Sequence, residues 1–320
     1  MSSEKAIGGY FELELHRGEE YHKDALALNT ARNCLEYILL TRQYSKVFIP
    51  RFTCEVVLEP FTKHNIFYEF YPINEQLEPA FFPELKQGEA FLYTNYFGLK
   101  QDGVKKVAEL YGKQAIIDNA QAFYAPCLPG IDTFYSPRKF FGVPDGGYLY
   151  TDAPPLPDLP QDTSWHRMQH LLRRIDENAE AGYSDFRINS SSLANNPIKR
   201  MSKLSRQILK SIDYEFSKNI RLQNYHLLSK ALDPSNRINL RPNEENVPLV
   251  YPYLSTDTAL KSKLIGNKIF VATYWPNVCK WALKSSMEFK FASQIVSLPI
   301  DHRYSHSDIE QIINKINQEI

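Results

Sequence analysis

Short β-rich runs alternate with amphipathic helical segments through the first 150 residues of the chain. The β-rich runs are residues 47–50, 67–71, 91–96, 115–118 and 148–150, and the helical segments are 25–40, 55–63 and 104–111. Thr30 is a candidate cap for the first helix. This alternation is typical of an α/β fold, in which helices cover both faces of a mostly parallel central sheet. Ligands of such folds bind at the carboxyl ends of the strands.

The second half of the chain has a different pattern. A proline-rich stretch at residues 153–160 cannot continue a helix or a central strand. The periodicity then predicts helices at 165–181, 199–232 and 306–320, strands at 247–254 and 269–274, and a polar break at 189–196. We therefore expect a large α/β domain over residues 1–205. Residues 206–320 are expected to form an interdomain helix and a small α+β domain.

The composition excludes several classes of partner. Lysine plus arginine number 37 and aspartate plus glutamate also number 37, so no net charge favours nucleic acid or an anionic membrane surface. No stretch approaches the roughly 20 apolar residues of a membrane helix. The four scattered cysteines form neither a zinc motif nor a disulfide framework, and His302 and His306 have no obvious third metal ligand. We expect a soluble cytoplasmic protein without a metal.

The main chemical signal is an acid at the end of a buried strand, followed by a lysine before a Gly-Gly turn. Asp118 ends an apolar run, where a lone carboxylate needs a cationic or hydrogen-bonding partner such as a protonated pyridine nitrogen. Lys139 lies between Pro137 and aromatic residues, a setting that lowers the pKa of an amine and suits Schiff-base chemistry. Each residue alone could be an ordinary turn acid or a solvated lysine. Their order suggests a pyridoxal phosphate (PLP) site.

A phosphate site is suggested by the start of the first helix. Backbone amides at a helix start bind phosphate, and Arg32, next to Ala31, would add charge-assisted hydrogen bonds. A capped helix with an exposed arginine is the plainer interpretation. The glycine-rich signatures of nucleotide-binding folds are absent from the sequence.

Several segments, in order along the chain, resemble the DegT/DnrJ/EryC1/StrS family of PLP enzymes, most of which are sugar-nucleotide aminotransferases. The resemblance covers about residues 25–150 and, less closely, the last fifty. It is carried by residues 94–102 (TNYFGLKQD), 116–122 (IIDNAQA), 136–139 (SPRK), 271–276 (VATYWP) and 297–300 (SLPI). It implies the fold-type-I architecture of aspartate aminotransferase and a homodimer with shared active sites.

The resemblance also implies roles for single residues. Lys139 would form the Schiff base with PLP and shuttle a proton between substrate and cofactor carbons, while Asp118 would keep the pyridine nitrogen protonated. Gln121 would contact the cofactor ring or its hydroxyl, and Ala31 and Arg32 would occupy the phosphate-loop positions. The implied reaction is ping-pong amino transfer from an amino acid such as glutamate to a keto sugar carried on a nucleotide.

The sequence departs from the family pattern at four places. Ala31-Arg32 replaces a Gly-Thr pair, and Phe134 replaces a serine, which leaves Thr133 or Ser136 to supply the hydroxyl. Cys54 replaces a stacking aromatic residue, for which Phe52 is a candidate substitute, and Ile198 replaces an asparagine that reaches the partner subunit. These changes leave open a non-catalytic relative that binds cofactor or ligand without turnover.

Two further expectations concern substrate and reaction class. Lyases on this scaffold replace the lysine by histidine, so Lys139 argues against a sugar dehydratase. The polar stretch at residues 183–196, which includes Arg187, is a candidate loop for binding the acceptor.

Overall fold

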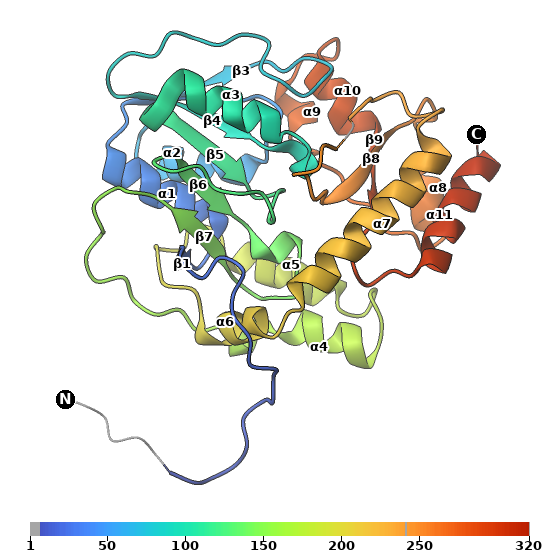
Figure 1. The fold of residues 1–320 in the computed structure, drawn as a ribbon, viewed down its shortest axis with the longest axis horizontal. Helices are drawn as coiled ribbons and strands as arrows, with labels where there is room; N and C mark the ends of the chain where they lie inside the picture. Colours follow the sequence, from blue (N-terminus) through green and yellow to red (C-terminus); the bar gives the residue numbers. More distant parts are fainter. Residues whose placement is uncertain (1–6, 241, 320) are drawn as a thin grey trace.

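A mixed seven-stranded sheet forms the core of the N-terminal part of the molecule (Figure 1). The computed structural model describes residues 7–240 and 242–319. The strand order is β1-β7-β6-β5-β4-β2-β3, in which β1 and β7 run antiparallel to their neighbours and all other pairs are parallel. The strands are β1 (Leu26–Leu28), β2 (Lys46–Pro50), β3 (Phe67–Tyr71), β4 (Glu89–Thr94), β5 (Ala115–Asn119), β6 (Asp132–Tyr135) and β7 (Gly147–Tyr150).

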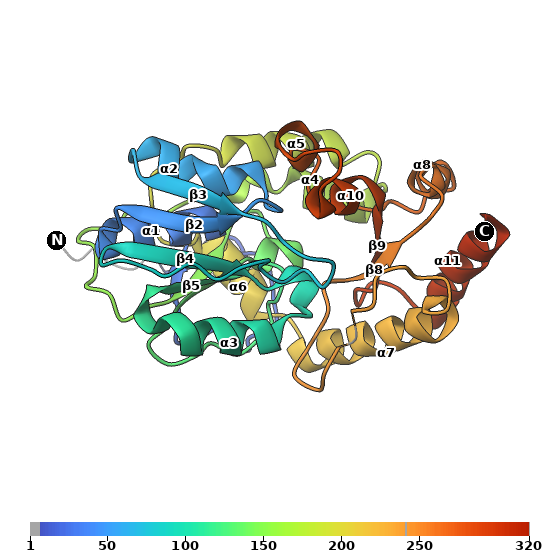
Figure 2. The same ribbon diagram turned by 90° about the horizontal axis from the view of Figure 1, so that it is seen from above.

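Alternating side chains of the central strands pack into two separate cores. In β4, Phe91 and Tyr93 point into one core, while Ala90 and Leu92 point into the other. Because both faces are covered, the strand is buried nearly throughout, as expected in a parallel sheet. The α1 and α2 side chains belong to the second core, and α3 belongs to the first. Figure 2 shows α2 and α3 on opposite sides of the sheet.

The helices of the large sheet region begin with α1, whose cap is as predicted. The Thr30 hydroxyl oxygen accepts a hydrogen bond from the Asn33 N–H at 3.0 Å. The remaining helices follow the strands or the proline-rich stretch. The helices of this part are α1 (Ala31–Arg42), α2 (Glu59–Lys63), α3 (Gln101–Tyr111), α4 (Gln169–Asp176), α5 (Tyr183–Ser192) and α6 (Lys203–Lys210).

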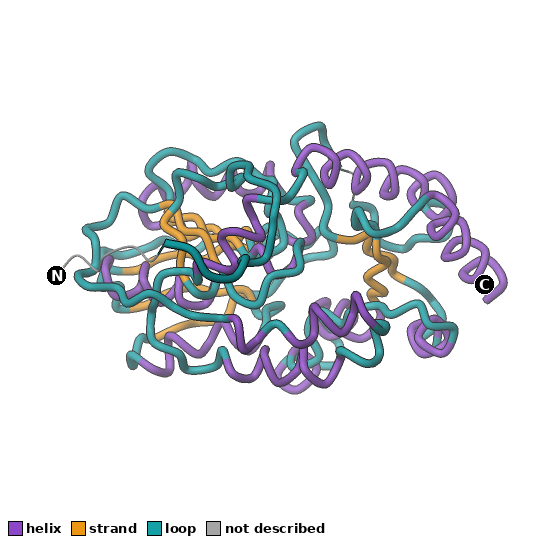
Figure 3. Tube along the Cα trace, turned by 90° about the horizontal axis from the view of Figure 1, so that it is seen from below, coloured by secondary structure: helices purple, strands orange, loops and turns teal. Residues whose placement is uncertain are grey.

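A second, two-stranded antiparallel sheet lies in the C-terminal part and is formed by β8 (Val250–Leu254) and β9 (Ile295–Pro299). Figure 3 shows it as a cluster separate from the large sheet. The long α7 contacts both β8 and α11. The helices here are α7 (Tyr214–Leu232), α8 (Leu260–Gly266), α9 (Val278–Trp281), α10 (Met287–Gln294) and α11 (His306–Glu319). Within the described residues, none of the helices has both the length and the apolar composition of a membrane span.

The structure corrects several predicted elements. Residues 26–28 form β1 rather than the first turn of a helix, and the predicted helix at 199–232 is interrupted at residues 211–213, where Asp213 caps α7. The stretch at 183–196, expected to be polar loop, is largely α5. The predicted strand at 269–274 is reduced to a single bridge between Ala272 and Ser297. The domain boundary near residue 205 stays a prediction.

Candidate active site

A cavity of about 550 Å³ opens at the carboxyl ends of β5 and β6. Its walls come from the start of α1, the segment after β2, the loop after β6, α5 and residues 273–277. Five of the six residues predicted for the site line it: Ala31, Arg32, Asp118, Ser136 and Lys139. The sixth, Gln121, is buried beside it, where its side-chain oxygen accepts a hydrogen bond from the Phe97 N–H at 2.9 Å. A contact between Gln121 and a cofactor stays a prediction.

Asp118 presents a buried carboxylate to this cavity from the end of β5. One oxygen, Oδ1, accepts a hydrogen bond from the Ala120 N–H at 2.8 Å. Burial raises the pKa of Asp118, and the Lys139 ammonium and the Ala120 N–H oppose that rise. The carboxylate is therefore placed to accept a hydrogen bond from a cationic group in the cavity.

Lys139 ends a short 3₁₀ turn, η4 (Pro137–Lys139), that follows β6. Its Nζ lies 5.9 Å from the ring centres of both Tyr274 and Trp275. The Lys139 side chain faces the cavity, but protein surrounds the cavity on most sides. This desolvation lowers the pKa of Lys139, while the charges of Asp118 and Cys54 act to raise it. A lowered pKa increases the fraction of free amine, which is the nucleophilic form.

The loop that carries Lys139 is fixed at both ends by backbone contacts. It joins the antiparallel strands β6 and β7, in which Tyr135 pairs with Tyr148. The Gly146 N–H donates a hydrogen bond to the Asn29 carbonyl at 2.7 Å, and a Cβ at Gly147 would lie 2.5 Å from the Ala31 nitrogen. The Gly-Gly turn is therefore needed because the start of α1 packs directly on it.

Positive charge gathers at the α1 end of the cavity. Arg32 Nη1 donates to Glu59 at 2.6 Å and to the Leu193 carbonyl at 3.0 Å. Arg138 donates to the Ser190 hydroxyl at 3.3 Å. The Nε atoms of both arginines are buried without a hydrogen-bond partner. Burial lowers the pKa of Arg138 to about 10, with Asp145 opposing and Arg32 adding to the shift, so Arg138 stays cationic at neutral pH.

These residues fit a phosphorylated pyridine cofactor. Arg138, Arg32 and the N-terminus of α1 offer donors and positive charge to a phosphate, and their unpartnered Nε atoms have spare hydrogen-bonding capacity. Asp118 would face the ring nitrogen and Lys139 the reactive carbon. Ser136, which the sequence offered as a substitute hydroxyl, lines the same cavity.

Sequence reasoning missed part of the cavity wall. Arg138 stands next to Lys139 in the motif, yet only its neighbour was singled out. Trp275 and Tyr274 form an aromatic wall, and the family-like segment at 271–276 was the available signal. Phe52, the proposed stacking residue, is fully buried and packs behind Trp275 with ring centres 5.1 Å apart. Phe186 and Ser190 of α5 also line the cavity, whereas Arg187 is exposed.

No family model matches the sequence, and no curated protein matches it. Solved structures do match. A DegT DnrJ EryC1 StrS aminotransferase from Brucella abortus is 18% identical with a TM-score of 0.61, and the match covers 92% of this chain and 85% of that one. The sugar aminotransferase CalS13 from Micromonospora echinospora is 13% identical with a TM-score of 0.61, covering 92% and 87%.

A third structure, NtdA from Bacillus subtilis with bound cofactor PMP, is 14% identical with a TM-score of 0.65, and the match covers 92% of this chain and 72% of that one. At these identities the likeness concerns the fold. The mostly parallel sheet flanked by helices matches the fold of these proteins over most of the chain. The chain therefore has the fold-type-I architecture of the DegT/DnrJ/EryC1/StrS aminotransferases, as the sequence motifs predicted.

Proposed function

We propose that this protein is a PLP-dependent aminotransferase that moves an amino group from an amino acid, with glutamate as the expected donor, to a keto sugar linked to a nucleotide. The observation that carries the proposal is the convergence of Lys139 and Asp118 on one cavity with a cationic rim. The shared fold with sugar aminotransferases supports the substrate class. NtdA, with its bound PMP, supports the cofactor.

When bound, PLP supplies an electron sink that stabilises negative charge on a substrate carbon. The chain's own residues have separate tasks. The Lys139 Nζ would attach the cofactor and would move a proton to and from the substrate carbon. The Asp118 carboxylate would hold a proton on the ring nitrogen, and Arg138 and the α1 N-terminus would neutralise the phosphate. Trp275 and Tyr274 exclude water from the side of the cavity beside the amine.

The experiment that tests this proposal is a visible absorption spectrum of the purified protein with added PLP, recorded for the wild type, Lys139→Ala and Lys230→Ala. Lys230 is an exposed residue near the end of α7 and serves as the matched control. We expect a band that requires Lys139 but not Lys230, and its conversion by excess glutamate. Borohydride reduction followed by peptide mass mapping should place the cofactor on Lys139. A spectrum unaffected by Lys139→Ala would refute the proposal.

A second candidate is a protein that binds the cofactor without turnover. Glu59 forms an ion pair with Arg32 at 2.6 Å, so part of the charge available to a phosphate is already neutralised. Such a protein would show the Lys139-dependent band, and no amino donor would alter it.

We also propose a homodimer with active sites near the subunit interface. Large apolar side chains are exposed on α4 and on α5, and α5 also lines the cavity: Ile175 is 80% exposed and Ile188 is 67% exposed. A contact with a second copy would remove them from water.

A further inference from the structure

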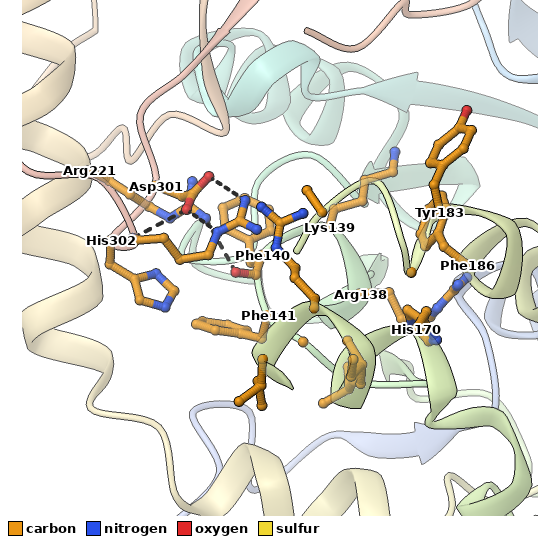
Figure 4. A pocket seen from close by; sticks show the side chains of 18 residues that line it. Arg138, Lys139, Phe140, Phe141, His170, Tyr183, Phe186, Arg221, Asp301 and His302 are labelled. Atoms are coloured by element: carbon orange, nitrogen blue, oxygen red, sulfur yellow. Dashed lines mark hydrogen bonds and ion pairs between the residues drawn. The ribbon is translucent and has the colours of Figure 1, made fainter. Parts of the chain in front are cut away.

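A second cavity of about 520 Å³ adjoins the first at the lysine. Arg138, Lys139 and Phe186 line both of them. From this junction the second cavity extends toward α7 and the loop after β9, where Arg221 and Asp301 lie (Figure 4). Arg303 also lines it. The two cavities therefore meet at Lys139.

The side chains around this second cavity carry an excess of positive charge. The cationic groups besides the shared pair are Arg174, Arg221 and Arg303, whereas burial lowers the pKa of His170 and His302 and favours their neutral forms. Among the described residues that line it, Asp301 is the one carboxylate. Asp301 is already bound by Arg303 in a two-pronged ion pair, with Nε and Nη2 donating at 2.6 and 2.9 Å. This excess favours an anionic ligand.

Arg221 is held in a fixed position within the wall. Its side chain is 1% exposed, its Nη1 donates to the Leu249 carbonyl at 3.1 Å, and its guanidinium lies over the Phe140 ring with the central carbon 4.6 Å from the ring centre. Its Nε is buried without a hydrogen-bond partner. Among the described residues no carboxylate hydrogen-bonds to Arg221, although Asp301 opposes the lowering of the Arg221 pKa by burial. A buried guanidinium held by carbonyl groups and an aromatic ring is suited to receive an anion.

We propose that this second cavity is the subsite for a carboxylate of the amino donor, with Arg221 and Arg303 as specificity-determining residues. The inference rests on the proposed function, because that reaction brings an amino acid to Lys139. A guanidinium fork matches a planar carboxylate, and the Arg303–Asp301 pair is an example of that geometry at this position. Phe140 and Phe141, which also line the cavity, offer apolar surface to the methylene groups of the donor.

The first test measures direct binding with glutarate, an unreactive dicarboxylate, by titration calorimetry on the wild type, Arg303→Gln and Lys230→Gln. The Arg303 side chain is half exposed, so its loss is compatible with folding. We expect glutarate to bind roughly tenfold or more weakly to Arg303→Gln, as for the loss of one charge-assisted contact, and unchanged to Lys230→Gln. Arg221→Lys, which keeps the charge but removes the fork, should weaken binding in the same direction. Equal binding to the wild type and Arg303→Gln would overturn the proposal.

The second test uses the cofactor-loaded protein and follows the rate at which glutamate or alanine converts the absorption band. In Arg303→Gln, the donor concentration for half-maximal rate should rise, while the limiting rate stays within a few-fold. A rise for glutamate alone places the side-chain carboxylate in the subsite, and a rise for both donors places the α-carboxylate there. If uridine diphosphate binding is lost in Arg303→Gln while glutarate binding is intact, the cavity takes a diphosphate and the proposal is wrong.

The two tests also separate this inference from the proposed function. A wild-type protein with the Lys139-dependent band but equal glutarate binding in the variants would retain its proposed function and lose the subsite. A wild-type protein without that band would lose the proposed function, whereas the glutarate titration would still decide whether the anion subsite exists.

Discussion

Burial favours the neutral forms of Lys139 and Asp118, whereas the charge of each residue favours the charged form of the other. Burial lowers the pKa of the amine and raises that of the carboxyl, while their mutual attraction acts in the opposite direction on both groups. The two groups therefore titrate as a coupled pair, and a change at one alters the protonation of the other. A cationic ring nitrogen beside Asp118 would take over part of the role that the lysine ammonium has in the free protein.

The first prediction concerns Asp118→Asn. The amide is nearly isosteric but cannot stabilise a positive ring nitrogen, so we expect the cofactor still to attach to Lys139 and the rate of conversion by glutamate to fall by about a hundredfold or more. Single-turnover absorption measurements would give this rate. A rate within a few-fold of the wild type would show that Asp118 has no such electrostatic role.

Among single residues, the sequence predicts site roles for those with a chemical requirement and misses neighbours that line the same cavity. Lys139 and Asp118 are recognisable because a strand-end acid and a lysine before a Gly-Gly turn are chemically unusual in that order. Arg138 and Trp275 could not be assigned, since nothing in a sequence tells which of several neighbouring side chains faces a cavity. Glu59, which pairs with Arg32, is 27 residues away along the chain and required the fold.

At the level of elements, the contact between the start of α1 and the start of β7 determines the shape of the cavity. A Cβ at Gly147 would lie 2.5 Å from the Ala31 nitrogen and 2.5 Å from the Thr30 carbonyl carbon. Both are backbone atoms at a capped helix start, which cannot move without displacing the helix. The α1 end of the cavity and the loop that carries Lys139 are therefore in direct backbone contact.

Gly147→Ala tests this connection. We expect a loss of about 1–3 kcal/mol in the free energy of unfolding from overpacking, measured by urea titration, together with weaker retention of PLP. Gly266→Ala is the matched control, because a Cβ at Gly266 would have no atom within 4 Å and the residue ends α8. Equal behaviour of the two variants would mean that the contact can relax without cost.

Elements with strong end signals were predicted well, and those defined by distant partners were not. Thr30 caps α1 as expected, because the cap is a local hydrogen bond. The sequence predicts helix over the three residues of β1, because a short apolar run does not distinguish a strand from a helical turn. The strand β1 exists through its pairing with β7. Asp213, a residue type that commonly caps helices, marks the break before α7 in the sequence. The apolar periodicity across residues 199–232 hides this break, because it continues through it.

At the scale of the whole molecule, stability should depend on pH through a histidine that anchors the N-terminal segment to the sheet. His22 is 4% exposed, its Nε2 lies 2.8 Å from the Phe123 carbonyl oxygen, and its ring centre lies 4.2 Å from that of Tyr135. Burial lowers the pKa of His22 from 6.5 to about 4, against the opposing effect of the Phe123 hydrogen bond. Between these values the unfolded chain binds the proton and the folded chain does not.

The stability linked to His22 is therefore fully present above about pH 6.5 and is lost as the pH falls toward 4. The loss amounts to about 3 kcal/mol at most. We expect His22→Gln to lower the overall stability but to flatten its pH dependence over this range, measured by urea unfolding at several pH values. The exposed His226 provides a control through His226→Gln. An unchanged slope in His22→Gln would contradict the assignment.

The exposed apolar residues of α4 and α5 allow a test of the proposed dimer. Replacing Ile175 and Ile188 together by Glu should shift the protein from dimer to monomer in multi-angle light scattering, because the charges would be buried at the interface. Ile265→Glu on α8, where the side chain is 42% exposed, is the control and should leave the dimer intact. A monomeric wild type would rule out this interface.

The attachment of the lysine loop has a consequence for motion during turnover. Both ends of the loop are tied into neighbouring strands through the pairing of Tyr135 with Tyr148, and the glycine turn is held against Asn29 and Ala31. The backbone near Lys139 thus has little freedom to travel. If the Lys139 amine must alternate between cofactor attachment and proton transfer, its movement has to come from rotation about its own side-chain bonds. The length of its four methylene groups therefore limits how far the amine can move.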